Sequence, residues 1–570
     1  MITRRILVSV FVLLMSVAVV FGAHQLLTPK QPSVAGMMPD GALFYLESPD
    51  FHTLLSDWNN SPQKQAWLKS DNYAVFSQSR LFGRLSQAQT EFASAAGTPP
   101  DMQLVAQIAG KETAFAWYDI GKLEFLYISR LPSSVFNESA LWQSRSKFDA
   151  RQSGSATFYV RTDPETQRTV AFASIGDWVV LGTREDLVAN AVALIGGGQG
   201  RTLRDESWYA DSVAAASAPG ELRMVLNLEK LVPSPYFRSY WIQQNITEMK
   251  QYRAAISDLH RNQSAYREER VLLRKNASES APVTADISQL AAVVPGNTGF
   301  YKALAAPTPQ QTVNILKDKL LDSSAQPETN NRYAPVVPVM DQTIGQAPDF
   351  ESRIDQAPPE PKNVDLWQPL LSIVTTARVD GLLLCQSSAL QSGDIFARFS
   401  SAVVLSTENN WNGEQIKSTL SAALDLQLST SHLGLGWRDR KGYSELDGVL
   451  HLVIQAQGKY LILANDPALL LAIQNQLNHK PVAAGPAVYA SGFNHTQESS
   501  NFHRISTFID RAGMRGGFSD SNDPNVPRQP AFFSGNIASF SQVFSGIVSE
   551  SMVVHNAGNN VTQTVTYQWR

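Results

Sequence analysis

The sequence is short of cysteine and of charge. Its single cysteine, Cys385, excludes an intrachain disulfide, a cysteine-based zinc site and an iron–sulfur cluster held by this chain's thiolates alone. Charged residues make up 17% of the chain, below the roughly 25% of an average soluble protein. The 47 basic and 51 acidic residues give a net charge of −4 without a basic run, so nucleic acid is not an expected partner.

Recognisable catalytic motifs are also missing. Neither G-x-S-x-G nor H-E-x-x-H occurs, which removes the usual sequence signals of α/β-hydrolases and zincins. Two S-x-x-K tetrads, Ser61–Lys64 and Ser144–Lys147, lack the K-T/S-G element of penicilloyl-serine enzymes and are interpreted as surface spacing. The glycine-rich stretch Gly196–Arg201 lacks the Gly-Lys-Ser/Thr ending of a P-loop and is interpreted as a loop that ends a helix.

The remaining candidate side chains do not form a site either. His495 and His503 are eight residues apart, which does not match ligand spacing on one helix. Cys385 lies in an apolar run and is expected to be a buried hydrophobe, and most of the eleven tryptophans are expected in the core rather than on a sugar-binding surface. No catalytic, cofactor-binding or metal-binding residue is therefore assigned, and no cofactor is expected.

The N-terminus predicts the compartment. Arg4 and Arg5 precede eighteen uncharged residues, Ile6–Ala23, close to the length of a bilayer span. Basic residues before the apolar run favour a cytoplasmic N-terminus, with the rest of the chain periplasmic and the inner membrane crossed once. An uncleaved anchor and a cleaved signal peptide, which would leave the protein secreted, both remain open; a buried core helix is the least favoured interpretation.

Two segments of the chain resemble each other. Gly176–Gly197 and Gly458–His479 each begin with a glycine, continue as a short apolar strand and end in a helix with an apolar stripe. A weaker match relates Pro39–Tyr45 to Pro295–Tyr301. These matches predict two copies of one α+β unit, although hairpin–helix units are common enough for a chance resemblance.

The strands are expected to be antiparallel. Lys111–Arg130 divides into two apolar runs around Gly121, and Val561–Trp569 alternates apolar and polar residues. An outer-membrane barrel is not expected, because the chain has many helical segments and too few strands of the required length.

A long helix is predicted between the two units. Tyr236–Ala277 contains neither glycine nor proline, and eight positions from Met249 to Leu273 follow a 3,4 spacing. A second seam runs from Leu81 to Ala95. The two seams could pack on each other, or the long helix could be an exposed arm for an envelope partner or for self-association.

The fold class predicted from these patterns is α+β, with two related halves of antiparallel sheet and packed helices, one long helix between them and an N-terminal transmembrane helix. The predicted boundaries are a cytoplasmic N-terminus (1–5), a transmembrane signal anchor (6–27), a linker (28–36), a first α+β unit (37–235), the long helix (236–277) and a second α+β unit (290–570) that contains a Pro-rich loop (322–362).

One resemblance to known proteins rests on the segment after the apolar run. Met38–Phe51, a proline–acid entry into an aromatic strand, together with the later GDWVVLGTREDLVANAVALI, resembles a family of uncharacterised, N-terminally anchored bacterial envelope proteins. The resemblance implies a bacterial envelope location but supplies no functional residue. The expected function is a membrane-anchored, extracytoplasmic binding or scaffold protein; the alternative is an envelope hydrolase or transferase whose site is not recognisable from sequence.

Overall fold

The computed structural model describes residues 33–69, 73, 77–78, 80–235, 249–262, 264–276, 286–321, 367–389, 398–428, 436–447, 451–479, 486–498 and 546–569. The predicted anchor over 6–27 and the predicted Pro-rich loop over 322–362 lie outside these ranges. The chain divides into two compact units. The first unit comprises Met1–Gln65, Ala74–His260 and Arg270–Lys275, and the second comprises Ala66–Tyr73, Arg261–Glu269 and Asn276–Arg570.

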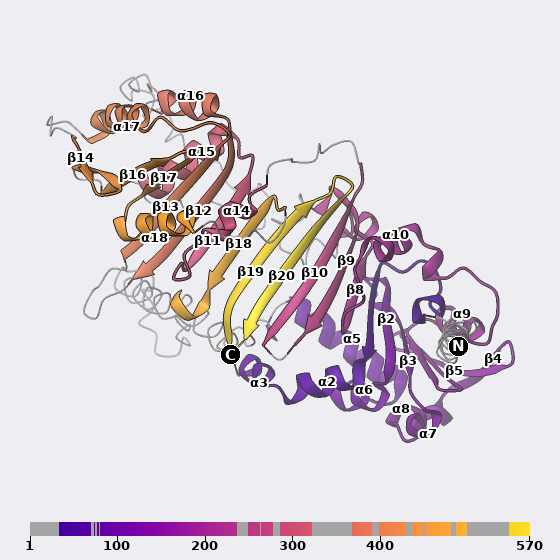
Figure 1. Cartoon of the computed structure of the whole chain (residues 1–570). Coiled ribbons are helices and arrows are strands. Elements are labelled where there is room, and N and C mark those ends of the chain that lie inside the picture. The colour runs from indigo at the N-terminus through magenta and orange to yellow at the C-terminus, as the bar shows by residue number, and fades with distance from the viewer. Residues whose placement is uncertain are drawn as a thin grey trace, which may run out of the picture. The chain divides into compact units, whose positions relative to one another are not determined.

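Antiparallel strands dominate both halves of the chain (Figure 1). The described residues up to 276 contain the strands β1 (Phe44–Asp50), β2 (Lys111–Asp119), β3 (Glu124–Arg130), β4 (Asp149–Ser153), β5 (Ala156–Thr162), β6 (Thr169–Ile175), β7 (Trp178–Gly182), β8 (Leu222–Leu226), β9 (Tyr252–Arg261) and β10 (Ala265–Arg274). Their main helices are α2 (Phe51–Asn60), α3 (Pro62–Leu68), α5 (Arg80–Ala96), α6 (Met102–Ile108), α7 (Ser133–Phe136), α8 (Ala140–Gln143), α9 (Glu185–Ile195), α10 (Ser207–Ala215) and α11 (Leu228–Leu231).

The described residues from 286 onward repeat this richness in strands. The strands are β11 (Phe300–Ala305), β12 (Val379–Ala389), β13 (Arg398–Thr407), β14 (Gly436–Arg440), β15 (Tyr443–Asp447), β16 (Leu452–Gln457), β17 (Tyr460–Ala464), β18 (Tyr489–Asn494), β19 (Ile547–Asn556) and β20 (Asn560–Trp569). The main helices are α14 (Ser288–Ala292), α15 (Pro309–Leu316), α16 (Gln368–Ala377), α17 (Gly413–Leu428) and α18 (Pro467–Asn478).

Strand order is the same in the two units. The first unit pairs its strands in the order β4-β5-β6-β7-β3-β2-β1-β8-β9. The second unit pairs them in the order β14-β15-β16-β17-β13-β12-β11-β18-β19, and β20 follows β19. Every one of these pairs is antiparallel, so positions in one unit can be matched to positions in the other through the register.

The predicted fold class is wrong, and the long helix is its clearest error. Tyr252–Arg261 and Ala265–Arg274 are the strands β9 and β10. Ala254 and Ile256 of β9 and Val271 and Leu273 of β10 belong to one buried cluster, and within each strand the two residues are two positions apart, as expected for side chains on one face of a strand. A 3,4 spacing would place its members on both faces of a strand, and here burial against the sheet outweighs helix propensity.

The turn between these strands explains why the hairpin is hard to see in the sequence. It contains no glycine; instead the side chain of Asn262 accepts hydrogen bonds from the amides of Ser264 (2.9 Å) and Ala265 (2.6 Å). The predicted long helix is therefore absent from 252–261 and 265–274, and its residues 236–248 lie outside the described ranges. An envelope partner or self-association stays a prediction. None of the described helices combines the length and apolar character needed to cross a membrane.

The strands and hairpins predicted from local periodicity are confirmed. Lys111–Arg130 is the antiparallel pair β2 and β3, and the predicted C-terminal strand is β20. The two matching segments are each a hairpin followed by a helix, β6-β7-α9 and β16-β17-α18. Their turn glycines, Gly176 and Gly458, have φ values of 56° and 58°, a conformation that other residues rarely adopt.

Candidate ligand-binding pocket

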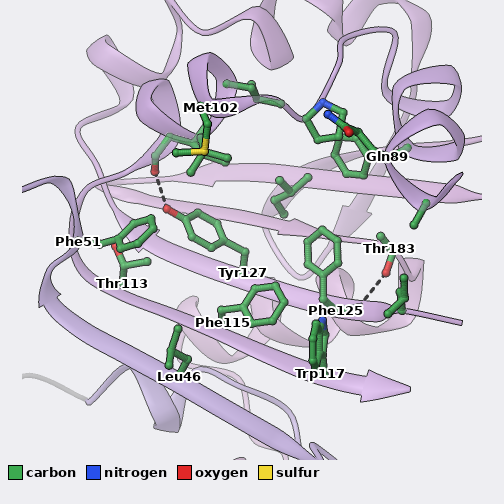
Figure 2. A pocket seen from close by; sticks show the side chains of 18 of the residues that line it. Leu46, Phe51, Gln89, Met102, Thr113, Phe115, Trp117, Phe125, Tyr127 and Thr183 are labelled. Carbon is green, nitrogen blue, oxygen red and sulfur yellow. Dashed lines mark hydrogen bonds between the residues drawn. The ribbon is translucent and has the colours of Figure 1, made fainter. Parts of the chain in front are cut away.

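The candidate site is a cavity of about 760 Å³ in the first unit. Its floor is one face of the sheet made by β1, β2, β3 and β7 (Figure 2). Alternation along the strands turns Phe115, Trp117 and Phe125 toward the cavity, while Ala114 and Ala116 join the buried cluster on the opposite face. The same hydrophobic strands therefore serve a packed core on one side and a cavity on the other.

Helices cover this face of the sheet. Leu85, Ala88 and Phe92 of α5 line the cavity, and Met102 and Val105 of α6 do so from a second helix. The 3- and 4-residue spacing along α5 places its apolar side chains on one side of the helix. The seam predicted over Leu81–Ala95 is thus part of a helix that packs over the sheet and not on a second long helix.

Aromatic rings give the floor a rigid surface. The rings of Phe115 and Phe125 are stacked with centroids 5.4 Å apart, and Phe92 stacks on Phe125 at 6.3 Å. Trp117 meets the edge of Phe115 at 5.7 Å. Aromatic pairs of this kind bury large apolar areas in a fixed geometry, so the cavity wall is preorganised for an apolar ligand.

The cavity reaches the surface along its helical side. Leu85 and Met102 both line it, yet their side chains are 40% and 44% exposed. Large apolar side chains at the rim of an apolar cavity form an entrance through which an apolar molecule can pass.

A cluster of hydroxyls lies on β1, β2 and β3, and three of them, on Ser48, Thr113 and Tyr127, belong to residues that line the cavity. The hydroxyls of Thr113 and Ser129 are 2.7 Å apart, and the amide of Gly110 donates to Ser129 Oγ at 3.0 Å. Tyr127 donates its hydroxyl proton to the carbonyl of Ile108 at 2.8 Å, and burial raises the pKa of this phenol well above its usual value. Ser48 lies opposite Thr113 in the register. Ser48, Thr113, Tyr127 and Ser129 are referred to as the hydroxyl cluster.

The three charged residues that line the cavity already have partners. Arg168 lies 2.6 Å from Glu91 Oε2 and donates to the carbonyl of Lys122. Asp101 accepts from the amides of Gln103 and Leu104 at the start of α6. Their charges are compensated locally, so they do not provide a free ion-binding group.

Glu47, the third charged lining residue, belongs to a buried charge network. Its carboxylate accepts from the Tyr45 hydroxyl at 2.7 Å and lies 4.0 Å from the guanidinium of Arg223. Arg223 in turn makes two hydrogen bonds to Asp258, at 2.7 and 2.8 Å. Burial raises the pKa of Glu47. Glu47, Arg223 and Asp258 are referred to as the charge triad.

The matching face of the second unit is filled. The register pairs Tyr45 with Ala116 in one unit and Tyr301 with Cys385 in the other. When the register is followed across β3 and β13, each member of the hydroxyl cluster is equivalent to an apolar residue of the second unit. Ser48, Thr113, Tyr127 and Ser129 correspond to Leu304, Leu382, Val403 and Leu405. These residues pack in or against a buried cluster with apolar side chains of α15, α16 and α17.

The residues considered from sequence do not assemble into a site. Ser61 accepts from the amide of Lys64 at 3.1 Å in the first turn of α3, and buried Ser144 donates to the carbonyls of Ala96 and Leu141. Gly196–Arg201 follows the end of α9. Burial raises the pKa of the Cys385 thiol to about 12, which makes it a poor nucleophile at neutral pH.

The histidine pair is not brought together in the part of the chain that the structure describes. His495 lies 3.7 Å from Glu550 and 4.8 Å, ring to ring, from Phe493, whereas His503 lies outside the described residues. No group of three or more His, Cys, Asp or Glu side chains suited to a metal ion occurs among the described residues. The tryptophans divide: Trp208 and Trp367 are buried, Trp117 lines the cavity, and Trp58 is 47% exposed.

The cavity is not evident in the sequence. The available signal was the set of hydroxyls on one face of Lys111–Arg130, at Thr113, Tyr127 and Ser129, where the equivalent positions of the second unit carry Leu and Val. Reading that signal requires the register between strands that are far apart in sequence, which periodicity alone does not supply.

Comparison with known proteins gives little further guidance. No protein-family model matches the sequence, and no curated protein matches it. The solved crystal forms I, IV and III of a protein named TP0453 align with TM-scores of 0.24, 0.23 and 0.23 and identities of 12%, 8% and 11%. The alignments cover 44%, 42% and 47% of this chain and 82%, 79% and 87% of TP0453. At these TM-scores the likeness carries no conclusion about fold or function.

Proposed function

We propose that this chain is a non-enzymatic binding protein of the bacterial envelope that holds an apolar ligand in the pocket of its first unit. The observation that carries the proposal is the cavity of about 760 Å³ between the sheet and the helices α5 and α6. This volume lies within the range of roughly 300–1,000 Å³ found for small-molecule sites. Its charged lining residues have partners within the protein, so the surface offered to a ligand is mainly apolar.

The energetics favour a flexible hydrocarbon chain or a molecule of similar character. Burial contributes about 0.8 kcal/mol per CH₂ group, so ten methylenes give roughly 8 kcal/mol before the cost of association. Stacked rings such as Phe115 and Phe125 are already ordered by one another, which lowers the cost of ordering the site on binding.

The location is part of the proposal and rests on the N-terminal sequence. Arg4, Arg5 and the uncharged run Ile6–Ala23 would direct the rest of the chain to the extracytoplasmic side. There, apolar ligands are plentiful in the neighbouring membranes. A protein partner in the envelope stays a prediction of the sequence.

The test is photolabelling of the full-length chain in an envelope fraction from bacteria that produce it. A twelve-carbon alkyl diazirine is added, and the labelled peptides are identified by mass spectrometry. We expect labelling to concentrate in β2, β3, α5 and α6. Ala88→Trp, which places an indole from α5 into the cavity, should lower this labelling at least fivefold, because the added volume displaces the ligand.

Ala210→Trp is the matched control, since Ala210 lies on an exposed face of α10. It should leave labelling unchanged, and thermal unfolding of both variants establishes that they are folded. Equal labelling of Ala88→Trp and the unsubstituted chain would overturn the proposed function, as would labelling spread evenly over the two units.

A further inference from the structure

One member of the hydroxyl cluster makes no hydrogen bond within the described residues. Ser48 lines the cavity and is 4% exposed, and its Oγ has no hydrogen-bond partner among the described residues. The other three hydroxyls all have partners within the protein. A buried hydroxyl without a partner is costly, and such groups in native proteins call for an explanation.

The second unit shows that the strand arrangement does not require this hydroxyl. The residue equivalent to Ser48 is Leu304, and the residue equivalent to its cross-strand neighbour Thr113 is Leu382. Both pack in or against an apolar cluster. The Ser48 hydroxyl, which makes no hydrogen bond within the described residues, therefore serves something other than the stability of the sheet.

The charges around the cavity limit what can lie beside Ser48. Glu47 and Asp101 are acidic, and Arg168, the one basic residue among the described residues that line the cavity, is held by Glu91. An anionic group in the cavity would lose its hydration without gaining an unpaired cation. A cationic group would have to compete with the Tyr45 hydroxyl and the Arg223 guanidinium for Glu47, and with two backbone amides for Asp101.

We infer that the pocket selects single-chain amphiphiles with an uncharged hydroxyl or ester headgroup, an inference that rests on the proposed function. The headgroup forms a hydrogen bond with Ser48 Oγ, and the hydrocarbon chain lies on the aromatic floor. Ser48 is then the residue that determines specificity, and the aromatic rings supply affinity that does not depend on the headgroup.

The experiment measures competition for the alkyl diazirine in the same envelope fraction with four twelve-carbon compounds: dodecane, dodecanol, dodecanoate and dodecylammonium at pH 7.5. We expect dodecanol to halve the pocket labelling at a concentration roughly two- to tenfold below that of dodecane, the effect of one net hydrogen bond. The two charged compounds should compete less well than dodecanol.

Ser48→Ala should bring dodecanol and dodecane to within twofold of each other while leaving competition by dodecane unchanged. Ser48→Thr, which keeps a hydroxyl, should retain the preference. Ser212→Ala is the matched control, because Ser212 is also buried but donates to the carbonyl of Trp208 in α10.

The possible failures can be told apart. Strongest competition by dodecanoate or dodecylammonium, or a preference for dodecanol that survives Ser48→Ala, would overturn the inference about the headgroup and leave the proposed function standing. Absence of pocket labelling in the unsubstituted chain would instead overturn the proposed function.

Discussion

The two units use one strand order for two different interiors. In the second unit, apolar side chains of the sheet, mostly leucine, valine and isoleucine, pack in one buried cluster with those of α15, α16 and α17. In the first unit, the equivalent face carries hydroxyls and aromatic rings beneath α5 and α6 and encloses a cavity. The difference teaches that backbone topology does not decide whether a sheet face is core or binding surface; the side chains at a few registered positions decide it.

A second contrast lies next to the pocket. The register makes the charge triad Glu47, Arg223 and Asp258 equivalent to three apolar residues of the second unit, Ala303, Ala490 and Val553. The Arg223 and Asp258 side chains are only 6% and 2% exposed. Charges buried to this extent are strongly interdependent, since each compensates the desolvation of the other.

The largest expected effect comes from breaking that triad. Asp258→Ala leaves the Arg223 guanidinium buried without its main partner and should lower the free energy of unfolding of the first unit by about 3–5 kcal/mol. Hydrogen exchange of β8 and β9 measures this loss, with β18 and β19 as internal reference. The triple variant Glu47→Ala, Arg223→Ala, Asp258→Val carries the residues of the second unit and should lose less than Asp258→Ala alone; a larger loss would contradict this account.

Equivalent positions on the pocket face should respond differently to alanine. Leu405→Ala opens a cavity in the filled core of the second unit and should cost about 2–5 kcal/mol. At the equivalent Ser129, alanine removes the acceptor for the Gly110 amide and should cost about 1–3 kcal/mol. Hydrogen exchange of β13 and β3 compares the two losses, and a loss at Ser129 as large as that at Leu405 would contradict the expected difference between a hydrogen-bonded hydroxyl and an apolar core side chain.

The smallest expected effect concerns pH. Asp50 caps α2 through a hydrogen bond from the Thr53 amide (3.0 Å), which lowers the pKa of the Asp50 carboxyl, whereas α15 in the second unit is capped by uncharged Thr308. Because the folded-state pKa lies below the unfolded value of about 3.9, this stabilisation is complete above that value and is lost as pH falls through the folded-state pKa.

Since Asp50 is only partly buried, solvent screens its charge and we expect a loss of only about 0.5 kcal/mol. Protection of α2 amides against hydrogen exchange, corrected for intrinsic rates, should fall below pH 4 while that of α15 amides does not. Asp50→Asn should keep the cap and abolish the pH dependence; an unchanged dependence would assign it to another carboxylate.

The sequence by itself determined the elements whose signals are local. Alternation in Val561–Trp569 and the paired apolar runs of Lys111–Arg130 were sufficient to predict strands, because burial of every second side chain is a property of a single segment. The turn glycines Gly176 and Gly458 marked two hairpins, each followed by a helix. Composition likewise limited the roles open to the one cysteine and argued against nucleic acid.

Only the tertiary structure decided the strands at 252–274 and the pocket. Tyr252, Ile256 and Leu273 fit a helical spacing equally well, and they are in strands because their side chains are buried where these segments extend the sheet. The pocket joins Ser48, Phe92 and Phe125 from separate elements, and whether a space remains among them depends on how α5 and α6 pack over the floor. Periodicity is a property of one segment, whereas a cavity depends on the register and packing between segments. For that reason the pocket could not be predicted from the sequence pattern.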